Sequence, residues 1–179
     1  MSSPKTIAQL LDTLPQVGRV EWIGVRGQRR APVTVLKSVR ADVGRGLVGD
    51  RYAGRSGKRQ VTLVQHEHLP VIASMLRNRE LRSKKQDYVD EHVDGLNPAK
   101  LRRNISVSGI NLLALKGKQF VIGDAVLEYT GLCHPCSFME KTLGAGGYNA
   151  VRGHGGITAR VVASGVIGIN DTIFKKAIE

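Results

Sequence analysis

The stretch "KQFVIGDAVLEYTG" (residues 118–131) has the pattern of a β-hairpin. Apolar and β-branched residues lie on both sides of Gly123-Asp124, and a short turn with glycine between two such runs favours a tight connection of antiparallel strands. The segment therefore predicts two paired strands that turn at Gly123-Asp124. It sets the expectation for the rest of the chain, which repeats the pattern of short apolar runs separated by glycine.

Strand patterns recur on both sides of this hairpin. Residues 17–27 ("VGRVEWIGVRG") and 31–39 ("APVTVLKSV") are predicted strands with the loop "RGQRR" between them, and 61–65 ("VTLVQ") is another. Residues 41–60 form a long glycine-rich connection. After the cysteines, 148–173 ("YNAVRGHGGITARVVASGVIGINDTI") predicts two short strands broken by glycines.

Helical patterns are short. In residues 66–78, Leu69, Ile72, Ala73 and Leu76 have helical spacing and Pro70 suits a first turn. Three further segments complete the prediction: a short amphipathic helix at most in "TIAQLLDTL", a short helix in "LNPAKLRRN" with Asn97 as N-cap and Pro98 at its first position, and a strand followed by a helical turn in "ISVSGINLLAL".

These elements predict a mainly β domain, a barrel or a sandwich, with a few short helices inserted between strands. The 179 residues suffice for one domain with its own core. We assign residues 1–16 to an N-terminal extension and 17–179 to the domain. The charged segment 77–96 is predicted to be an excursion from it.

Composition restricts the cellular setting. No window approaches the roughly 20 apolar residues of a membrane span, and the N-terminus lacks the pattern of a secretory signal. Two cysteines make no disulfide framework, so we expect a cytoplasmic protein with reduced thiols and no membrane partner.

The net charge of +12 indicates a basic surface that attracts polyanions or is merely solvated, and the glycine-interleaved run 26–59 favours an anionic ligand. Against only Asp42 and Asp50, residues 26–59 carry ten cationic side chains: Arg26, Arg29, Arg30, Lys37, Arg40, Arg45, Arg51, Arg55, Lys58 and Arg59. A second basic run covers residues 77–85. Binding to nucleic acid is not expected, because only 4% of the residues are aromatic and single strands bind by stacking.

Both cysteines lie in "TGLCHPCSFME" (130–140). A structural zinc site needs four ligands, and the five histidines lack the matching spacing, so no structural zinc is expected. Pro135 can start a helix whose core face includes Met139 and Leu143. Cys136 would then lie in its first turn, where the helix favours a thiolate that acts in redox, metal or sulfur chemistry. A thioredoxin-type dithiol would need βαβ surroundings, which are missing. Burial of both cysteines as small apolar side chains remains the simpler alternative.

Two basic stretches carry further candidates. "GLVGDRYAGRSGKR" departs from the Walker A pattern, since Gly57-Lys58 precedes Arg59, but it keeps an anion-binding composition. In "LRRNISVSG", Arg102 and Arg103 supply forked donors and Asn104 an amide, a set that can hold a phosphate or the edge of a heterocycle. An exposed basic helix end is the alternative.

Together, "GLVGDRYAG", "LRRNISVSGINLLAL", "GLCHPC" and "GGYNAVRGHGGITARV" resemble the MOSC domain, named for the C-terminus of molybdenum cofactor sulfurase. The order and spacing fit from about Val17 to Asp171. The chain resembles the small stand-alone bacterial members rather than the sulfurases, which carry a large additional domain, and no pyridoxal phosphate is expected.

The resemblance implies a β-barrel in which Cys136 ligates molybdenum or carries sulfur beside a bound pyranopterin cofactor. Arg102 and Asn104 match an Arg and an Asn that related proteins place beside the pterin, and Asp50 and Arg51 match a Gly-Asp-Arg/His element. Arg103 joins the predicted cofactor-binding residues as the second forked donor.

Two functions follow from this reading. The first is a molybdenum-dependent oxidoreductase that reduces N-hydroxylated small molecules with electrons from a separate reductase. The second is a sulfur carrier that receives a persulfide on Cys136 from a sulfur donor. His154, in "RGHGG", is a candidate proton donor or simply a turn residue.

Overall fold

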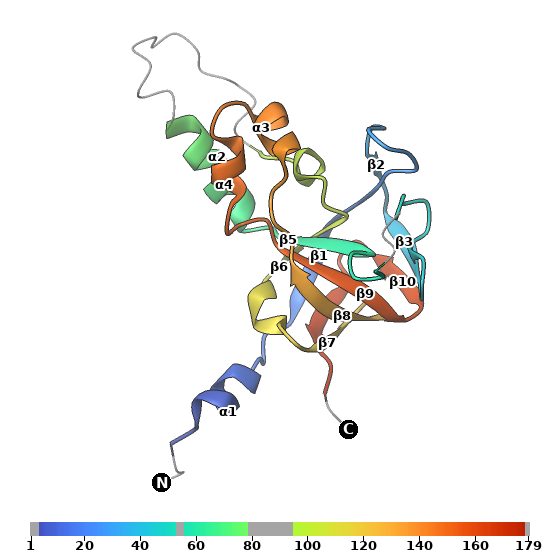
Figure 1. Ribbon diagram of the computed structural model, residues 1–179. Coiled ribbons are helices and arrows are strands. Elements are labelled where there is room, and N and C mark those ends of the chain that lie inside the picture. Colours follow the sequence, from blue (N-terminus) through green and yellow to red (C-terminus); the bar gives the residue numbers. More distant parts are fainter. Residues whose placement is uncertain (1–3, 53–55, 79–94, 178–179) are drawn as a thin grey trace.

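Seven strands form a closed barrel in the computed structural model, which describes residues 4–52, 56–78 and 95–177 (Figure 1). Around the barrel the order is β1, β11, β7, β8, β9, β5 and β6, and β6 pairs with β1 again. Their bounds are β1 Gly18–Val25, β5 Val61–Gln65, β6 Ile105–Ser108, β7 Gln119–Ile122, β8 Ala125–Leu132, β9 Ile157–Ala163 and β11 Thr172–Lys175. The barrel is therefore confirmed and the sandwich excluded.

The hairpin predicted in residues 118–131 is present as β7 and β8. Ile122 pairs with Ala125 across the turn, and every neighbouring pair in the barrel is antiparallel except β5 and β6. Gly123 has a φ of 54°. A Cβ atom there would lie 2.5 Å from the carbonyl oxygen of Val166, so the turn needs glycine both for its conformation and for this close approach.

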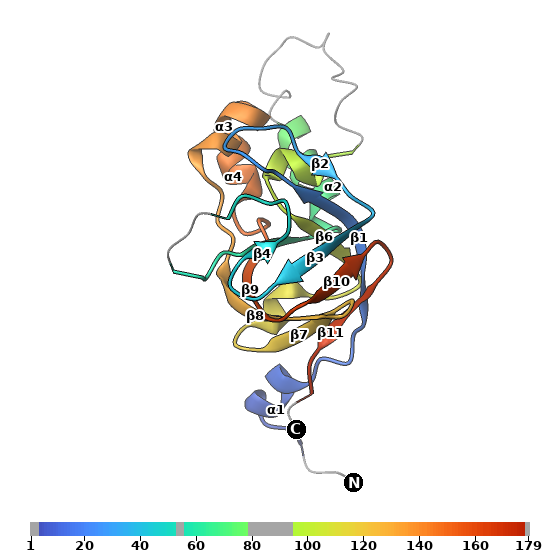
Figure 2. The same cartoon turned by 90° about the vertical axis from the view of Figure 1, so that its right-hand side faces the viewer.

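A three-stranded sheet lies against the barrel (Figure 2). Its order is β10 (Gly165–Gly168), β3 (Ser38–Asp42) and β4 (Gly46–Leu47). The single strand predicted over 31–39 is wrong: β2 (Thr34–Val35) pairs with β1, whereas β3 pairs with β10. The chain divides because the two halves of the segment hydrogen-bond to different sheets.

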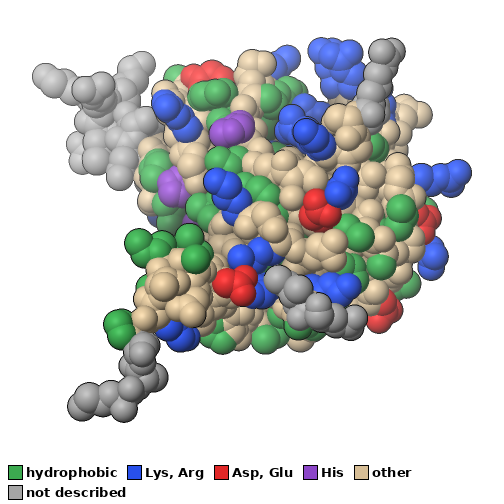
Figure 3. Space-filling view, turned by 60° about the horizontal axis from the view of Figure 1, so that its bottom comes forward, with side chains coloured by type: hydrophobic (Ala, Val, Ile, Leu, Met, Phe, Trp, Pro, Cys, Tyr) green, Lys and Arg blue, Asp and Glu red, His purple; other side chains and the backbone are tan. Residues whose placement is uncertain are grey.

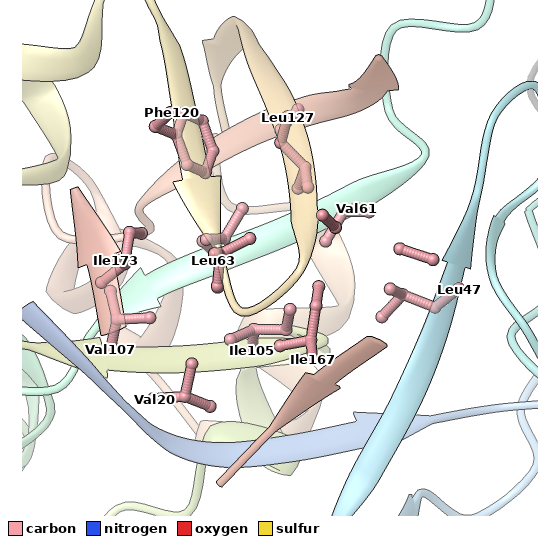
Figure 4. Packing of buried hydrophobic residues seen from close by; sticks show 14 of the residues in the cluster. Val20, Leu47, Val61, Leu63, Ile105, Val107, Phe120, Leu127, Ile167 and Ile173 are labelled. Atoms are coloured by element: carbon pink, nitrogen blue, oxygen red, sulfur yellow. The ribbon is translucent and has the colours of Figure 1, made fainter. Parts of the chain in front are cut away.

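One apolar cluster fills the barrel and joins it to the small sheet (Figure 4). Phe120 and Leu127 come from the hairpin, and Leu63 and Ile105 from the parallel pair; all four are fully buried. Leu47 and Ile167 of the small sheet reach the same cluster. The core therefore fixes both sheets together.

Short helices cover the end of the barrel where β5 and β8 finish (Figure 1). They are α2 (His68–Asn78), the 3-10 helix η3 (Pro98–Leu101), α3 (Ser137–Leu143) and α4 (Gly147–Val151). Their apolar side chains form a second cluster that includes Ile72, Leu101, Met139 and Val151. We call these helices the cap.

The helical predictions are largely confirmed. Leu69, Ile72 and Ala73 of α2 are buried, and the side chain of Asn97 accepts a hydrogen bond from the Ala99 N–H at the start of η3. The turn predicted after β6 is the 3-10 helix η4 (Leu112–Leu115). The prediction of only two strands in residues 148–173 is wrong, because this part of the chain begins within α4 and then supplies β9, β10 and β11.

The N-terminal helix α1 (Ile7–Asp12) buries none of its residues. Asp12 joins it to the barrel through ion pairs with Lys118 and Lys175 at N–O distances of 3.0 and 2.8 Å. Most of the charged segment 77–96 lies outside the described residues. No helix in the described part of the chain is long and apolar enough to cross a membrane.

Candidate functional site

Cys136 lies directly before α3 and is exposed. It is the N-cap of the helix rather than a first-turn residue, because α3 begins at Ser137 and not at Pro135 as predicted, and its side chain makes no capping hydrogen bond. Met139 and Leu143 are buried on the core face of α3, as expected. Cys133 is 2% exposed, so the two thiols differ in their access to solvent.

Cys136 opens into a pocket of about 940 Å³, which we call the basic groove. The groove lies between the β1–β2 loop, η3 and α3, and Figure 2 shows that loop passing beside α3. No acidic side chain is among its described lining residues. Its cationic side chains are Arg26, Arg29, Arg30, Lys100, Arg102 and Lys141.

Arg26 and Arg102 line the groove together with Cys136. The Arg26 guanidinium donates from Nη2 to the carbonyl oxygen of Arg102 at 3.3 Å. Burial, followed by the neighbouring positive charge of Arg102, lowers the pKa of Arg26, and the carboxylate of Asp50 opposes that shift. The guanidinium of Arg102 lies 5.2 Å from the ring centre of Phe138. The groove thus combines positive charge with one aromatic surface.

Asp50 anchors the backbone of Arg26. Its carboxylate accepts the Arg26 N–H at 2.8 Å, and the Arg51 N–H donates to the Arg26 carbonyl oxygen at 2.6 Å. Asp50 therefore sets the course of the β1–β2 loop. The exposed side chain of Arg51 is not among the groove's lining residues.

Arg103 points away from the groove into the protein. It is 5% exposed, and its guanidinium donates to the carbonyl oxygens of Leu101 and Gly155, both at 2.6 Å, and of Cys133 at 2.9 Å. Burial lowers the pKa of this guanidinium. Arg103 therefore ties η3, the cysteine segment and the loop after α4 together.

Asn104 is 5% exposed, directly precedes β6 and joins β1 to β5. Its side-chain oxygen accepts from the N–H and hydroxyl of Thr62 at 3.1 and 2.8 Å, and its amide nitrogen donates to Gly24 at 3.3 Å. These bonds use both ends of the amide inside the barrel wall.

Of the predicted site residues, the structure brings Cys136 and Arg102 together in the groove. Asp50, Arg103 and Asn104 lie behind it as supports. Arg26, Arg29 and Arg30 of the predicted basic run 26–59 also line the groove, whereas Lys100 of η3 and Lys141 of α3 were not predicted. The three arginines belong to the loop "RGQRR", which connects two predicted strands. The glycine-rich part of the run, residues 46–59, was also expected to bind anions, but none of its described side chains lines the groove.

His154 packs against His68 of α2, also outside the groove. The ring centres are 5.0 Å apart and nearly perpendicular, and the Nδ1 atom of each ring is buried with no hydrogen-bond partner in the described structure. Burial, then the charge of His154, lowers the pKa of His68.

The described residues contain no cluster of three or more His, Cys, Asp or Glu side chains arranged for a metal ion. The thiol of Cys136 is the soft donor that lines the groove. A metal bound there would need its remaining ligands from a cofactor.

Comparison with known proteins identifies the family and the fold. The family model described as MOSC domain matches residues 43–174. The structure is similar to the YuaD protein from Bacillus subtilis, with a TM-score of 0.69 and 20% identity over 90% of this chain and 97% of that one. YiiM from Escherichia coli gives a TM-score of 0.62 at 17% identity over 90% of this chain and 71% of that one. YiiM from Geobacillus stearothermophilus gives 0.59 at 15% identity over 89% and 75%. No curated protein matches the sequence.

Proposed function

This chain belongs to the MOSC domain family, and on that premise we propose that it holds a molybdenum–pyranopterin cofactor on Cys136 and reduces N-hydroxylated small molecules. The observation that carries the proposal is the exposed thiol at the edge of a groove with six cationic side chains. Thiolates suit soft metals, and a cationic pocket suits the phosphate of a pterin. The residues present therefore fit the group.

The chain supplies charge and position. Arg26 is half-buried and lines the groove together with Cys136, so it supplies positive charge on the side where ligation would require a thiolate. Arg29, Arg30 and Lys100 are available to neutralise a phosphate, and the ring of Phe138 offers a flat surface to a heterocycle. Asp50 and Arg103 act through the backbone as positioning residues.

The reaction cleaves an N–O bond with two electrons and two protons and releases water with the reduced amine. The bound cofactor would supply the two-electron chemistry, and a separate flavin or iron–sulfur reductase would supply the electrons. The open mouth of the groove leaves space for a small substrate beside Cys136.

The decisive experiment compares the wild type with Cys136→Ser after anaerobic purification from a host that makes molybdenum cofactor. We expect molybdenum in the wild type and almost none in the variant, with the rate on an N-hydroxylated purine at least about a hundredfold lower. Ser164→Ala, in the connection between β9 and β10 and outside the groove lining, is the control and should retain both properties. Equal molybdenum content and equal rates in wild type and Cys136→Ser would contradict the proposal.

The same exposure of Cys136 supports a second candidate, a sulfur carrier. Here a donor persulfide is attacked by the Cys136 thiolate; the sulfane sulfur moves to Cys136 and the donor leaves as a thiolate. Mass spectrometry after incubation with a cysteine desulfurase tests this. One added sulfur on wild type but not on Cys136→Ser, in a protein without molybdenum, would favour the carrier over the reductase.

A further inference from the structure

A second pocket lies at the other end of the cysteine segment. It has a volume of about 620 Å³ and is bounded by Leu113 of η4, the end of β8, and the loop that follows α4. Cys133 and His134 line this pocket, whereas Cys136 lines the basic groove. The C-x-x-C segment therefore borders two separate pockets, and the proposed cofactor site occupies only the basic groove.

The wall of the second pocket is rigid. The Cys133 N–H donates to the Gly156 carbonyl oxygen at 2.9 Å, and Arg103 bridges the carbonyl oxygens of Cys133 and Gly155. A Cβ atom on Gly155 would collide with the Cys133 carbonyl oxygen, and one on Gly156 with that of Leu63. Glycine thus allows the loop after α4 to lie directly against the cysteine segment, and the pocket is formed before any ligand arrives.

Three polar side chains on this pocket have no partner. His134, Asn149 and Arg152 are exposed, and none of them forms a side-chain hydrogen bond or ion pair within the described structure. They come from two separate segments and all line one pocket. A guanidinium, an amide and an imidazole together can donate to the two oxygens of a carboxylate.

Two leucines add an apolar surface beside these donors. Leu113 is 46% exposed and Leu132 is 47% exposed, and both line the pocket. Exposed apolar side chains next to a few polar groups are typical of a ligand pocket, in which the polar groups orient the ligand and the apolar ones cover it. The arrangement fits a molecule with a polar head and an apolar tail.

Charge distinguishes this pocket from the groove. The basic groove has six Lys or Arg side chains, whereas Arg152 is the one Lys or Arg among the described residues of the second pocket. One fixed positive charge matches a single carboxylate rather than a phosphate-rich cofactor. We propose that the second pocket is a binding site for small amphipathic carboxylates, separate from the cofactor groove.

The test is a titration of the 15N-labelled full chain with hexanoate, followed by backbone amide shifts. We expect saturable shifts at Gly153, Gly155 and Gly156. Acetate, which lacks the tail, and hexanol, which lacks the charge, should each bind at least about tenfold more weakly at equal ionic strength. Hexanol binding as tightly as hexanoate would overturn the proposal, as would saturable shifts centred on residues 99–102 and 136–138 of the groove.

Variants locate the interaction. Arg152→Gln and Leu132→Ser, both at exposed positions, should each weaken hexanoate at least about tenfold without changing thermal unfolding. Arg45→Gln, an exposed arginine in the β3–β4 turn, is the matched control and should bind like the wild type. Unchanged hexanoate affinity in Arg152→Gln would refute the proposal. Because the readout needs neither molybdenum nor turnover, the result is independent of the reductase proposal.

Discussion

The two sides of the C-x-x-C segment contain the same residue types in opposite environments. On the groove side, Cys136 and Arg102 line an open pocket; on the framework side, Cys133 and Arg103 are almost fully buried. Arg102 and Arg103 are sequence neighbours, and the cysteines are three residues apart. Residue type and local sequence therefore do not decide which of the two cysteines, or which of the two arginines, is available to a ligand.

The backbone at Arg102 explains the difference between the arginines. Arg102 has a φ of 57° and caps the end of η3, a left-handed conformation that is uncommon outside glycine. This turn sends Arg102 toward Phe138 while the next side chain, Arg103, enters the protein and meets three carbonyl oxygens. The framework thus holds the cysteine segment, and the groove side is left with groups available to a ligand.

The sharpest test of this division compares Arg103→Gln with Arg102→Gln. We expect Arg103→Gln to lower the free energy of unfolding by about 3–5 kcal/mol, because each buried carbonyl that loses its donor costs about 1–3 kcal/mol. Arg102→Gln should change it by less than about 0.5 kcal/mol while weakening cofactor retention. Urea denaturation of both variants without cofactor gives the two values. Similar losses of stability in the two variants would contradict the assignment of Arg103, but not Arg102, to the framework.

A smaller effect is expected from the cysteines. Cys133→Ser replaces a buried thiol that accepts a hydrogen bond from Arg59 with a hydroxyl, at an expected cost of about 1–3 kcal/mol. The Arg59 Nη2 atom donates to the larger Cys133 Sγ atom at 3.9 Å, a distance too long for a normal hydrogen bond to a serine oxygen. Because Cys136 is exposed, Cys136→Ser should unfold like the wild type. If the two serine variants have the same urea midpoint, the assignment of Cys133 to the framework is wrong.

The smallest effect concerns the histidine pair beside the framework. The pKa of His68 in the folded protein is lowered from its ordinary value of 6.5, first by burial and then by His154, with Glu67 opposing. The unfolded chain therefore binds more protons as pH falls below about 6.5, and stability decreases until the folded pKa is passed. His68→Gln should flatten the stability profile between pH 7 and 5. An unchanged slope in that variant would contradict this origin.

Local sequence was sufficient for most of the elements. Alternation and the Gly123-Asp124 turn identified the hairpin, and the spacing of Leu69, Ile72 and Ala73 identified α2, because these patterns depend on neighbours within a few residues. The strand predicted over 31–39 was wrong since its two halves pair with different partners, which no local pattern encodes. The helix α4 was missed because its five residues border a glycine-rich run that reads as loop.

The sequence by itself identified the mainly β class, the family resemblance and Cys136 at the start of a helix, because turn residues, periodicity and motif order are local properties. Only the tertiary structure decided the closure of the barrel between β1 and β11, and the burial of Arg103 and Asn104 behind the groove. It also brought the arginines of residues 26–30 next to Cys136, more than a hundred residues away in the chain. These outcomes depend on contacts between distant segments, whose geometry is set by packing and by the hydrogen bonds that buried polar groups require.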